Sequence, residues 1–131
     1  MQILQPKNWP APKGYANGIV AKGNMVFLAG QVGWDENEKF PSSDFVEQAR
    51  QALRNIITVL AQAGGRPEHI VRMTWFITDK DAYMKSQKRL GAVYREVMGR
   101  HYPVMSLLVI SALVENGAKL EIEATAVLPE A

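Results

Sequence analysis

Residues 119–128 alternate strictly between polar and apolar side chains, and no other feature of the chain constrains its fold as much. On an extended strand, one face would carry the apolar side chains Leu120, Ile122, Ala124 and Ala126. The other face would carry Lys119, Glu121, Glu123 and Thr125. The simpler interpretation is an edge or solvent-facing strand with its charges outward. The alternative is that one glutamate faces a cleft and acts there as a general base.

Two amphipathic helices are predicted, over residues 44–63 and about residues 81–98. At the start of the first helix, Asp44 and Glu47 resemble a capping box. Its apolar residues recur at steps of three and four: Val46, Ala49, Leu53, Ile56, Ile57 and Leu60. The glycine pair 64–65 should end it. The inner face of the second helix is marked by Tyr83, Gln87, Leu90, Gly91, Tyr94, Val97 and Met98.

The remaining apolar segments read as strands, at residues 19–22, 25–29, 70–78, 104–113 and 119–128. Gly23-Asn24 and Asn116-Gly117 predict hairpin turns between the first two strands and between the last two. The order β-β-α-β-α-β-β predicts one α+β domain over residues 1–131, a mixed sheet with two helices on one face. The chain offers no third layer, so we expect oligomerisation to cover the bare face.

Composition excludes several classes of function. The chain has no cysteine, which rules out disulfides, a thiol nucleophile and cysteine-based metal sites. Its net charge is only +2, from 15 basic and 13 acidic residues, so nucleic-acid binding has little support. There is no signal-peptide pattern, and no apolar run approaches the roughly 20 residues that span a bilayer. We therefore expect a soluble cytoplasmic protein with no membrane partner.

Four segments resemble, in register, the RidA/YjgF family, also called the L-PSP endoribonuclease family. They are KGYA at 13–16, GNMVFLAGQ at 23–31, QARQALRNI at 48–56 with AGG at 63–65, and Pro103 and Ser106 with EIEA at 121–124. The resemblance covers nearly the whole chain. It implies a chorismate-mutase-like fold assembled as a homotrimeric barrel, with three ligand clefts between subunits. It also implies hydrolysis of reactive enamines and imines to ammonia and a 2-keto acid, without metal or cofactor.

The resemblance assigns Glu121 as the catalytic residue that positions the attacking water. It assigns Tyr15, Gly30 and Gln31 to the substrate site. The family's arginine, which binds the substrate carboxylate, falls on Met105, and its nearby cysteine falls on Leu107. Met105 and Leu107 would therefore line a more apolar cleft. The family's asparagine in the second helix falls near Gly91.

A methionine cannot replace the two parallel hydrogen bonds that a guanidinium gives a carboxylate. We therefore expect a divergent member of the family, whose substrate is shifted away from small 2-imino acids. The ligand would be less charged, or held by another cation, for which Arg72, Arg95 and Arg100 are candidates.

Trp34, in the loop after Gln31, is predicted to flank the cleft, whereas Trp75 lies inside a strand and is expected in the core. His101 could reach the cleft, but a structural role is favoured.

Three functions remain open from the sequence. The first is an enamine or imine deaminase-type hydrolase acting on a small reactive metabolite at clefts between subunits. The second is a non-catalytic trimer that binds a small metabolite. The third is the endoribonuclease or translation-inhibitor activity in the family's older name, which the charge balance supports least.

Overall fold

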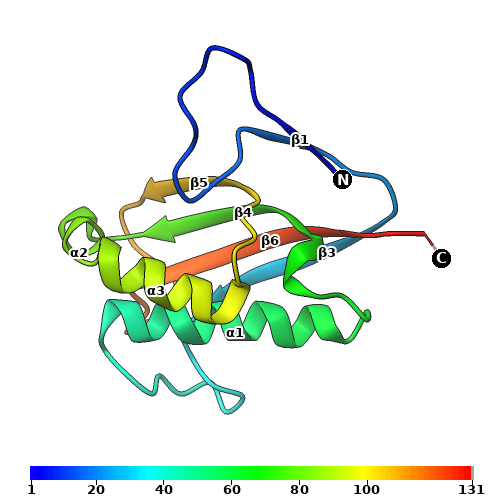
Figure 1. Cartoon of the computed structure of the whole chain (residues 1–131). Helices are drawn as coiled ribbons and strands as arrows, with labels where there is room; N and C mark the ends of the chain where they lie inside the picture. Colours follow the sequence, from blue (N-terminus) through cyan, green and yellow to red (C-terminus); the bar gives the residue numbers. More distant parts are fainter. Residues whose placement is uncertain (131) are drawn as a thin grey trace.

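The computed structural model describes residues 1–130, and their main feature is a four-stranded mixed sheet (Figure 1). Its strands are β3 (Asn24–Val32), β6 (Leu120–Leu128), β4 (Ile70–Ile77) and β5 (Val104–Val109), in the order β3-β6-β4-β5. β4 and β5 are parallel, and the other two pairs are antiparallel. The predicted α+β class with a mixed sheet is confirmed.

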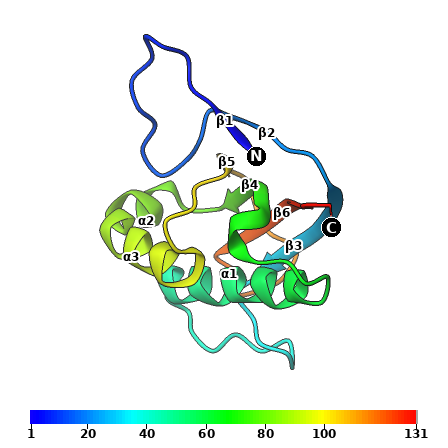
Figure 2. The ribbon, with the colours of Figure 1, turned by 45° about the vertical axis from the view of Figure 1, so that its right-hand side comes forward.

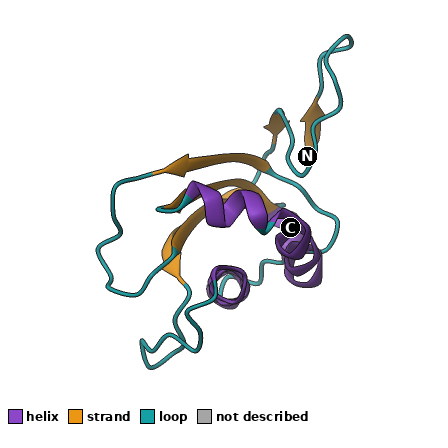
Figure 3. Ribbon diagram, turned by 90° about the vertical axis from the view of Figure 1, so that its left-hand side faces the viewer, coloured by secondary structure: helices purple, strands orange, loops and turns teal. Residues whose placement is uncertain are grey.

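Helices cover one face of this sheet, as predicted (Figures 1 and 3). The long helix α1 (Phe45–Ala61) and helix α3 (Gln87–Met98) pack beside each other under the strands. The short α2 (Lys80–Lys85) and the 3-10 turn η1 (Pro67–His69) complete the helical elements. The core between the layers is largely apolar, with Leu53, Ile56, Met73 and Ile122 fully buried. Within residues 1–130, no helix is long and apolar enough to cross a membrane.

The alternating segment is confirmed as strand β6, but the edge position offered by the simpler interpretation is wrong. β6 lies between β3 and β4 and pairs with both. Its four apolar side chains are buried against the helices. On the other face, Glu123 is exposed and Glu121 is half-buried. Alternation therefore shows only that the two faces of a strand differ in burial. It does not show whether the strand lies at the edge or in the centre of its sheet.

The predicted hairpin at Gly23-Asn24 is wrong. The strand before it, β2 (Gly18–Val20), pairs with β1 (Gln2–Leu4) in a separate ribbon that projects from the body of the molecule (Figures 1 and 2). Gly23 has φ +148°, and a Cβ there would lie 1.9 Å from the carbonyl oxygen of Leu128. The glycine is needed for a close backbone approach between the ends of β3 and β6.

The second predicted hairpin is also wrong, although its turn exists. Gly117 has φ +89°, and the amide of Ala118 donates to the carbonyl of Glu115 at 3.2 Å. This turn lies in a loop that carries the chain from the edge strand β5, past β4, to β6. The strand predicted over 104–113 ends at Val109, because its partner β4 ends at Ile77 and the last bond joins the amide of Ile110 to the Ile77 carbonyl.

The second predicted helix is interrupted at Ser86. The Ser86 amide donates to the carbonyl of Tyr83, only three residues back, and its ψ of 5° leaves the helical range. α2 is capped by Asp79, whose carboxylate accepts from the amide of Ala82 at 3.1 Å. The interruption lets α2 and α3 follow different directions along the edge of the sheet.

α1 begins where the sequence predicts, with half of the expected capping box. The Asp44 carboxylate accepts from the Glu47 amide at 3.0 Å, but the Glu47 carboxylate pairs with Arg50. Arg50 also reaches Glu96 of α3 at 2.8 Å, and Arg89 of α3 reaches Asp44 at 2.9 Å. These ion pairs fix α3 beside α1.

Replacing Asp44 by alanine should destabilise the protein by about 1 kcal/mol at neutral pH, because the cap is lost. The hydrogen bond from Arg89, followed by that from the Glu47 amide, lowers the pKa of Asp44 below 3.8. The carboxylate's contribution is therefore full above 3.8 and disappears as the pH falls through the lower native value. Urea unfolding of Asp44→Ala and wild type should differ at pH 7 and converge in strong acid. Asp81→Ala removes only an exposed ion pair with Lys85 and should change stability by under about 0.5 kcal/mol.

Candidate functional site

Glu121 and Gly30 meet on the sheet face opposite the helices. The register of β3 against β6 changes between Leu28 and Gln31, so two residues of β3 oppose one of β6. This is the arrangement of a β-bulge, which re-aims the chain locally. A Cβ placed on Gly30 would lie 2.2 Å from the Oε2 atom of Glu121. The half-buried Glu121 carboxylate therefore rests directly on the backbone of Gly30.

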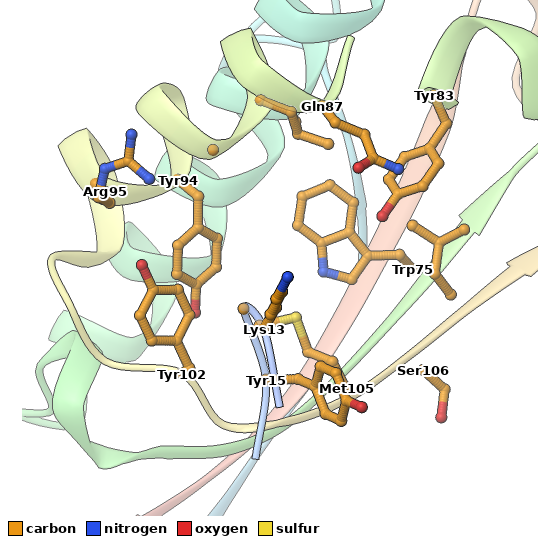
Figure 4. A pocket seen from close by; sticks show the side chains of 14 residues that line it. Lys13, Tyr15, Trp75, Tyr83, Gln87, Tyr94, Arg95, Tyr102, Met105 and Ser106 are labelled. Carbon is orange, nitrogen blue, oxygen red and sulfur yellow. The ribbon is translucent and has the colours of Figure 1, made fainter. Parts of the chain in front are cut away.

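Tyr15, Met105 and Leu107 line a different feature, a cavity of about 450 Å³ between the sheet and α3 (Figure 4). The segment that carries Tyr15 is held onto β5 by backbone contacts. The amide of Ala16 donates to the carbonyl of Pro103 at 3.0 Å, and Ala16 pairs with Val104. Tyr15 is 42% exposed at the cavity mouth, whereas Met105 and Leu107 are half-buried in its wall.

The wall formed by α3 and the following loop is aromatic. The rings of Tyr94 and Tyr102 stack with centroids 5.3 Å apart. Burial, with the neighbouring Tyr102, raises the pKa of the Tyr94 phenol, which stays protonated and donates to the His101 carbonyl at 2.7 Å. The His101 Nε2 atom lies 2.6 Å from the carbonyl oxygen of Ile70. Nε2–H donates to this carbonyl, so His101 ties its loop to the start of β4, which supports the structural role favoured from the sequence.

The floor of the cavity carries Trp75, which is only 4% exposed. The core position predicted for this residue is confirmed. Its indole Nε1–H has no hydrogen-bond partner within residues 1–130. Figure 4 shows this nitrogen on the side of the ring where Lys13 lies, and the nitrogen itself is closed off from solvent.

Within one chain, the two groups of predicted residues lie on opposite faces of the sheet. Met105 pairs with the buried Met73, on the helix side. Glu121 pairs with Phe76, whose side chain alternates with the buried Trp75 and Ile77 and so points the other way. Within one chain, Glu121 and the cavity therefore do not belong to one site.

Comparison with known proteins identifies the family of this chain. The profile of the family described as Endoribonuclease L-PSP matches residues 6–128, almost the whole chain. The chain belongs to this family, the RidA/YjgF family.

A relative from Escherichia coli K12 named "Putative reactive intermediate deaminase TdcF" is 32% identical over 130 residues, covering 96% of each protein. The crystal structure of YyfB, a Rid-family protein of Yersinia pestis, superimposes with a TM-score of 0.82 at 28% identity, covering 97% of this chain and 98% of that one. E. coli TdcF with bound serine gives a TM-score of 0.69 at 32% identity, covering 98% and 100%. The fold is thus the chorismate-mutase-like fold of this family.

The other predicted residues of this RidA-family chain, Gln31 and Trp34, lie at the end of β3 and in the loop that follows it. Gln31 is half-buried beside the bulge, and its side-chain amide donates to the Ala29 carbonyl. Trp34 follows Val32, the residue paired with Glu121, and its ring packs on Phe40 with centroids 5.8 Å apart. Asn55 holds this loop by donating to the Trp34 carbonyl at 2.8 Å. Whether Trp34 flanks a bound ligand stays a prediction.

The structure also ranks the three candidate cations near Met105. Arg95 lines the large cavity with Met105. Arg72 lines a smaller hollow of about 200 Å³ next to Tyr15 and Met105, and is exposed on the sheet. Arg100 is exposed, and it lines neither of these two spaces.

Several cavity residues were missed as site residues by the sequence reasoning. Tyr83, Gln87, Leu90, Gly91 and Tyr94 were predicted to form the inner face of the second helix. They do face inward, but that face covers a cavity. The polar members of the stripe, Tyr83 and Gln87, were the available signal, because a helix face packed only on a core is apolar.

Proposed function

We propose that this chain is a cytoplasmic enamine or imine deaminase-type hydrolase acting on a small reactive metabolite at clefts between subunits. The observation that carries the proposal is the Glu121 carboxylate, held half-buried on the Gly30 bulge of a RidA-family chain. A positioned carboxylate of this kind is the general base that hydrolysis of a C=N bond requires.

The exposed sheet face supports a composite site. Met25, Phe27 and Leu108 are large apolar residues on this face, and they are 59%, 74% and 45% exposed. Apolar surface of this kind is typical of an interface. A closed homotrimer would cover it and would bring Glu121 of one copy to the cavity of the next. In that assembly, Glu121 and Gly30 come from one subunit, and Tyr15, Met105 and Leu107 come from its neighbour.

The chemistry needs only a base, a water molecule and a hydrogen-bonding pocket. Glu121 takes a proton from water while the hydroxide adds to the imine carbon, giving a carbinolamine. The protonated Glu121 then returns that proton to the nitrogen. Glu121 next takes the proton of the new hydroxyl group and passes it to the nitrogen, so that the C=O bond forms, the C–N bond breaks and ammonia leaves. The sum is one imine and one water converted to one carbonyl compound and one ammonia.

The substrate is proposed to differ from the small 2-imino acids. Met105 stands where the family's arginine is expected and cannot donate a hydrogen bond to a carboxylate. The cavity beside it offers more space and more aromatic surface than a three-carbon acid would fill. Tyr15, at the mouth, would orient the reacting end of the substrate.

The test is ammonia release from a panel of imines, each generated freshly from an amino acid by an oxidase. The proposal expects the chain to accelerate release from at least one bulky imine more than from the alanine-derived one. If every imine decays at the uncatalysed rate while a ligand still binds the cavity, the chain is a non-catalytic binding trimer. Cleavage of RNA at the same rate by wild type and Glu121→Gln would indicate a contaminating nuclease.

Gly30→Ala should lower turnover by about 10- to 100-fold without unfolding the protein. The added methyl group would lie 2.2 Å from Oε2 and 2.8 Å from Cδ of Glu121, so the carboxylate must move. The clash involves the free end of a flexible side chain, and the fold can therefore accommodate it. Steady-state ammonia release with a thermal melt would check this prediction. A wild-type rate would show that the position of the carboxylate is unimportant.

A further inference from the structure

We propose that Asn116 is a site of spontaneous deamidation, and that its isoaspartyl product loosens the entry of the chain into β6. The reaction goes beyond the proposed function and does not depend on it. Asn116-Gly117 predicted a hairpin between neighbouring strands, but the pair lies in the loop from the edge strand β5 to the central strand β6. Figure 1 shows this loop running from the tip of β5 to the start of β6.

The reaction is an attack by a backbone nitrogen on the side chain of the residue before it. The Gly117 nitrogen forms a bond to the side-chain carbonyl carbon of Asn116, and the bond from that carbon to Nδ2 breaks. The Gly117 amide proton leaves with Nδ2 as ammonia, and a cyclic imide remains. Water then opens the imide at either carbonyl, giving aspartate or isoaspartate. Glycine favours the attack because no Cβ obstructs the approach of its nitrogen.

Asn116 and Gly117 are the central residues of an exposed turn. The turn is closed by one bond, from the Ala118 amide to the Glu115 carbonyl at 3.2 Å. Within residues 1–130, neither the Asn116 side chain nor the Gly117 amide forms a hydrogen bond. The segment before the turn, residues 111–115, is irregular and largely exposed. The side chain and the attacking nitrogen can therefore reach the geometry of attack with little loss of structure.

A second Asn-Gly pair, Asn17-Gly18, offers the same chemistry in a more restrained setting. Both asparagines are exposed, so access of water does not distinguish them. The Asn17 side chain donates to Oε1 of Gln5 at 2.9 Å. Gly18 pairs with Leu4 in the ribbon of β1 and β2, and a Cβ on Gly18 would lie 3.2 Å from the Leu4 side chain. Attack at Asn17 requires the loss of these contacts, so we expect it to be slower.

The isoaspartyl product would disturb an anchor of the protein interior. The Gly117 carbonyl accepts from the side-chain amide of Gln48 at 2.9 Å, and the Lys119 amide donates to the same side chain at 2.7 Å. In isoaspartate the main chain runs through the side-chain carbons, so one extra carbon stands directly before Gly117. Gln48 is buried in α1 and cannot follow a displaced carbonyl. We therefore expect the lengthened turn to lose its bond to Gln48.

Peptide mapping of the full chain, incubated in mildly alkaline buffer at physiological temperature, tests the site. Tryptic cleavage places Asn17 in the peptide of residues 14–22 and Asn116 in the peptide of residues 101–119. Relative to an unincubated sample, Asn116 should deamidate at least about 10-fold faster than Asn17 in the folded chain. In guanidinium chloride the restraints on Asn17 are lost, and the two rates should become similar. Equal rates in the folded chain, or faster reaction at Asn17, would overturn the proposed site.

The effect on the fold is measured on the acidic fraction, separated from the unmodified protein by ion exchange. This fraction should unfold at a lower urea concentration than the unmodified protein. Asn116→Asp adds the same charge without lengthening the main chain, and it should unfold as wild type does. An acidic fraction as stable as the unmodified protein would overturn the loss of the Gln48 bond. Asn116→Gln should yield no acidic fraction over the same period, and its appearance there would place the reaction at another residue.

Discussion

Glu121→Gln should reduce ammonia release from the best imine at least about 100-fold, the usual contribution of a general base. The substitution keeps the size and shape of the side chain, so its contact with Gly30 can persist. An amide cannot accept the proton of the attacking water, and hydroxide addition must then proceed without a base. The effect should appear in kcat, and ligand affinity should change little.

Glu123→Gln provides the matched control. Glu123 is two residues further along β6, on the same face of the sheet, and it is exposed. The same change of charge there should leave the rate within about threefold of wild type, because Glu123 has no part in the proposed proton transfer. Equal losses in both variants would mean that the negative charge of this face matters in general. Equal wild-type rates would remove the catalytic role of Glu121.

Gln48→Leu should destabilise the protein by about 3 kcal/mol or more, the largest effect on stability that we expect from one polar side chain. Gln48 is 1% exposed within α1. Its amide nitrogen donates to the carbonyls of Ser42 and Gly117, both at 2.9 Å. Its amide oxygen accepts from the Lys119 backbone at 2.7 Å. Leucine has a similar volume but would leave these three backbone groups without the partner that joins them to α1.

The measurement is urea unfolding at one fixed protein concentration, because any oligomer makes stability depend on concentration. Gln62→Leu is the control, since Gln62 is exposed at the end of the same helix. It should change the free energy of unfolding by no more than about 0.5 kcal/mol. If Gln48→Leu matched this control, the backbone groups would have found other partners. Because Gln48 anchors the residues that enter β6, the variant should also lose turnover at temperatures where it is still folded.

Local patterns predicted the elements of this fold well, but not their pairing. The stripe of α1, its Asp44 cap and the alternation of β6 each report which side of an element is buried, and all three are confirmed. Both hairpin predictions were wrong, because a pair of residues that contains glycine does not always mark a tight hairpin turn. It can also mark a close approach of two backbones or a turn within a longer loop. Gly23 serves the approach to Leu128, and Gly117 turns a loop that does not join neighbouring strands.

The candidate site was predictable only in part, for a related reason. The resemblance to a family supplied residue identities, including Glu121 and Tyr15, but not their location. Strand pairing places Glu121 and Met105 on opposite faces, which no pattern within either strand could reveal. The unpaired N–H of Trp75 was also invisible, because a tryptophan inside a strand has the same sequence signature whether or not its nitrogen has a partner.

The central claim is that each site combines Glu121 of one copy with the cavity of another, and subunit mixing tests it most directly. Gly91→Phe should inactivate the cavity by filling it, since only the end of Arg95 lies within 4 Å of the new Cβ. Glu121→Gln should inactivate the other half. Co-expressed with two tags and purified as mixed oligomers, the two inactive variants should regain about a third of the wild-type rate, because a closed trimer that contains both variants keeps one of its three interfaces intact. Mixed oligomers as inactive as either variant alone would contradict a site shared between copies.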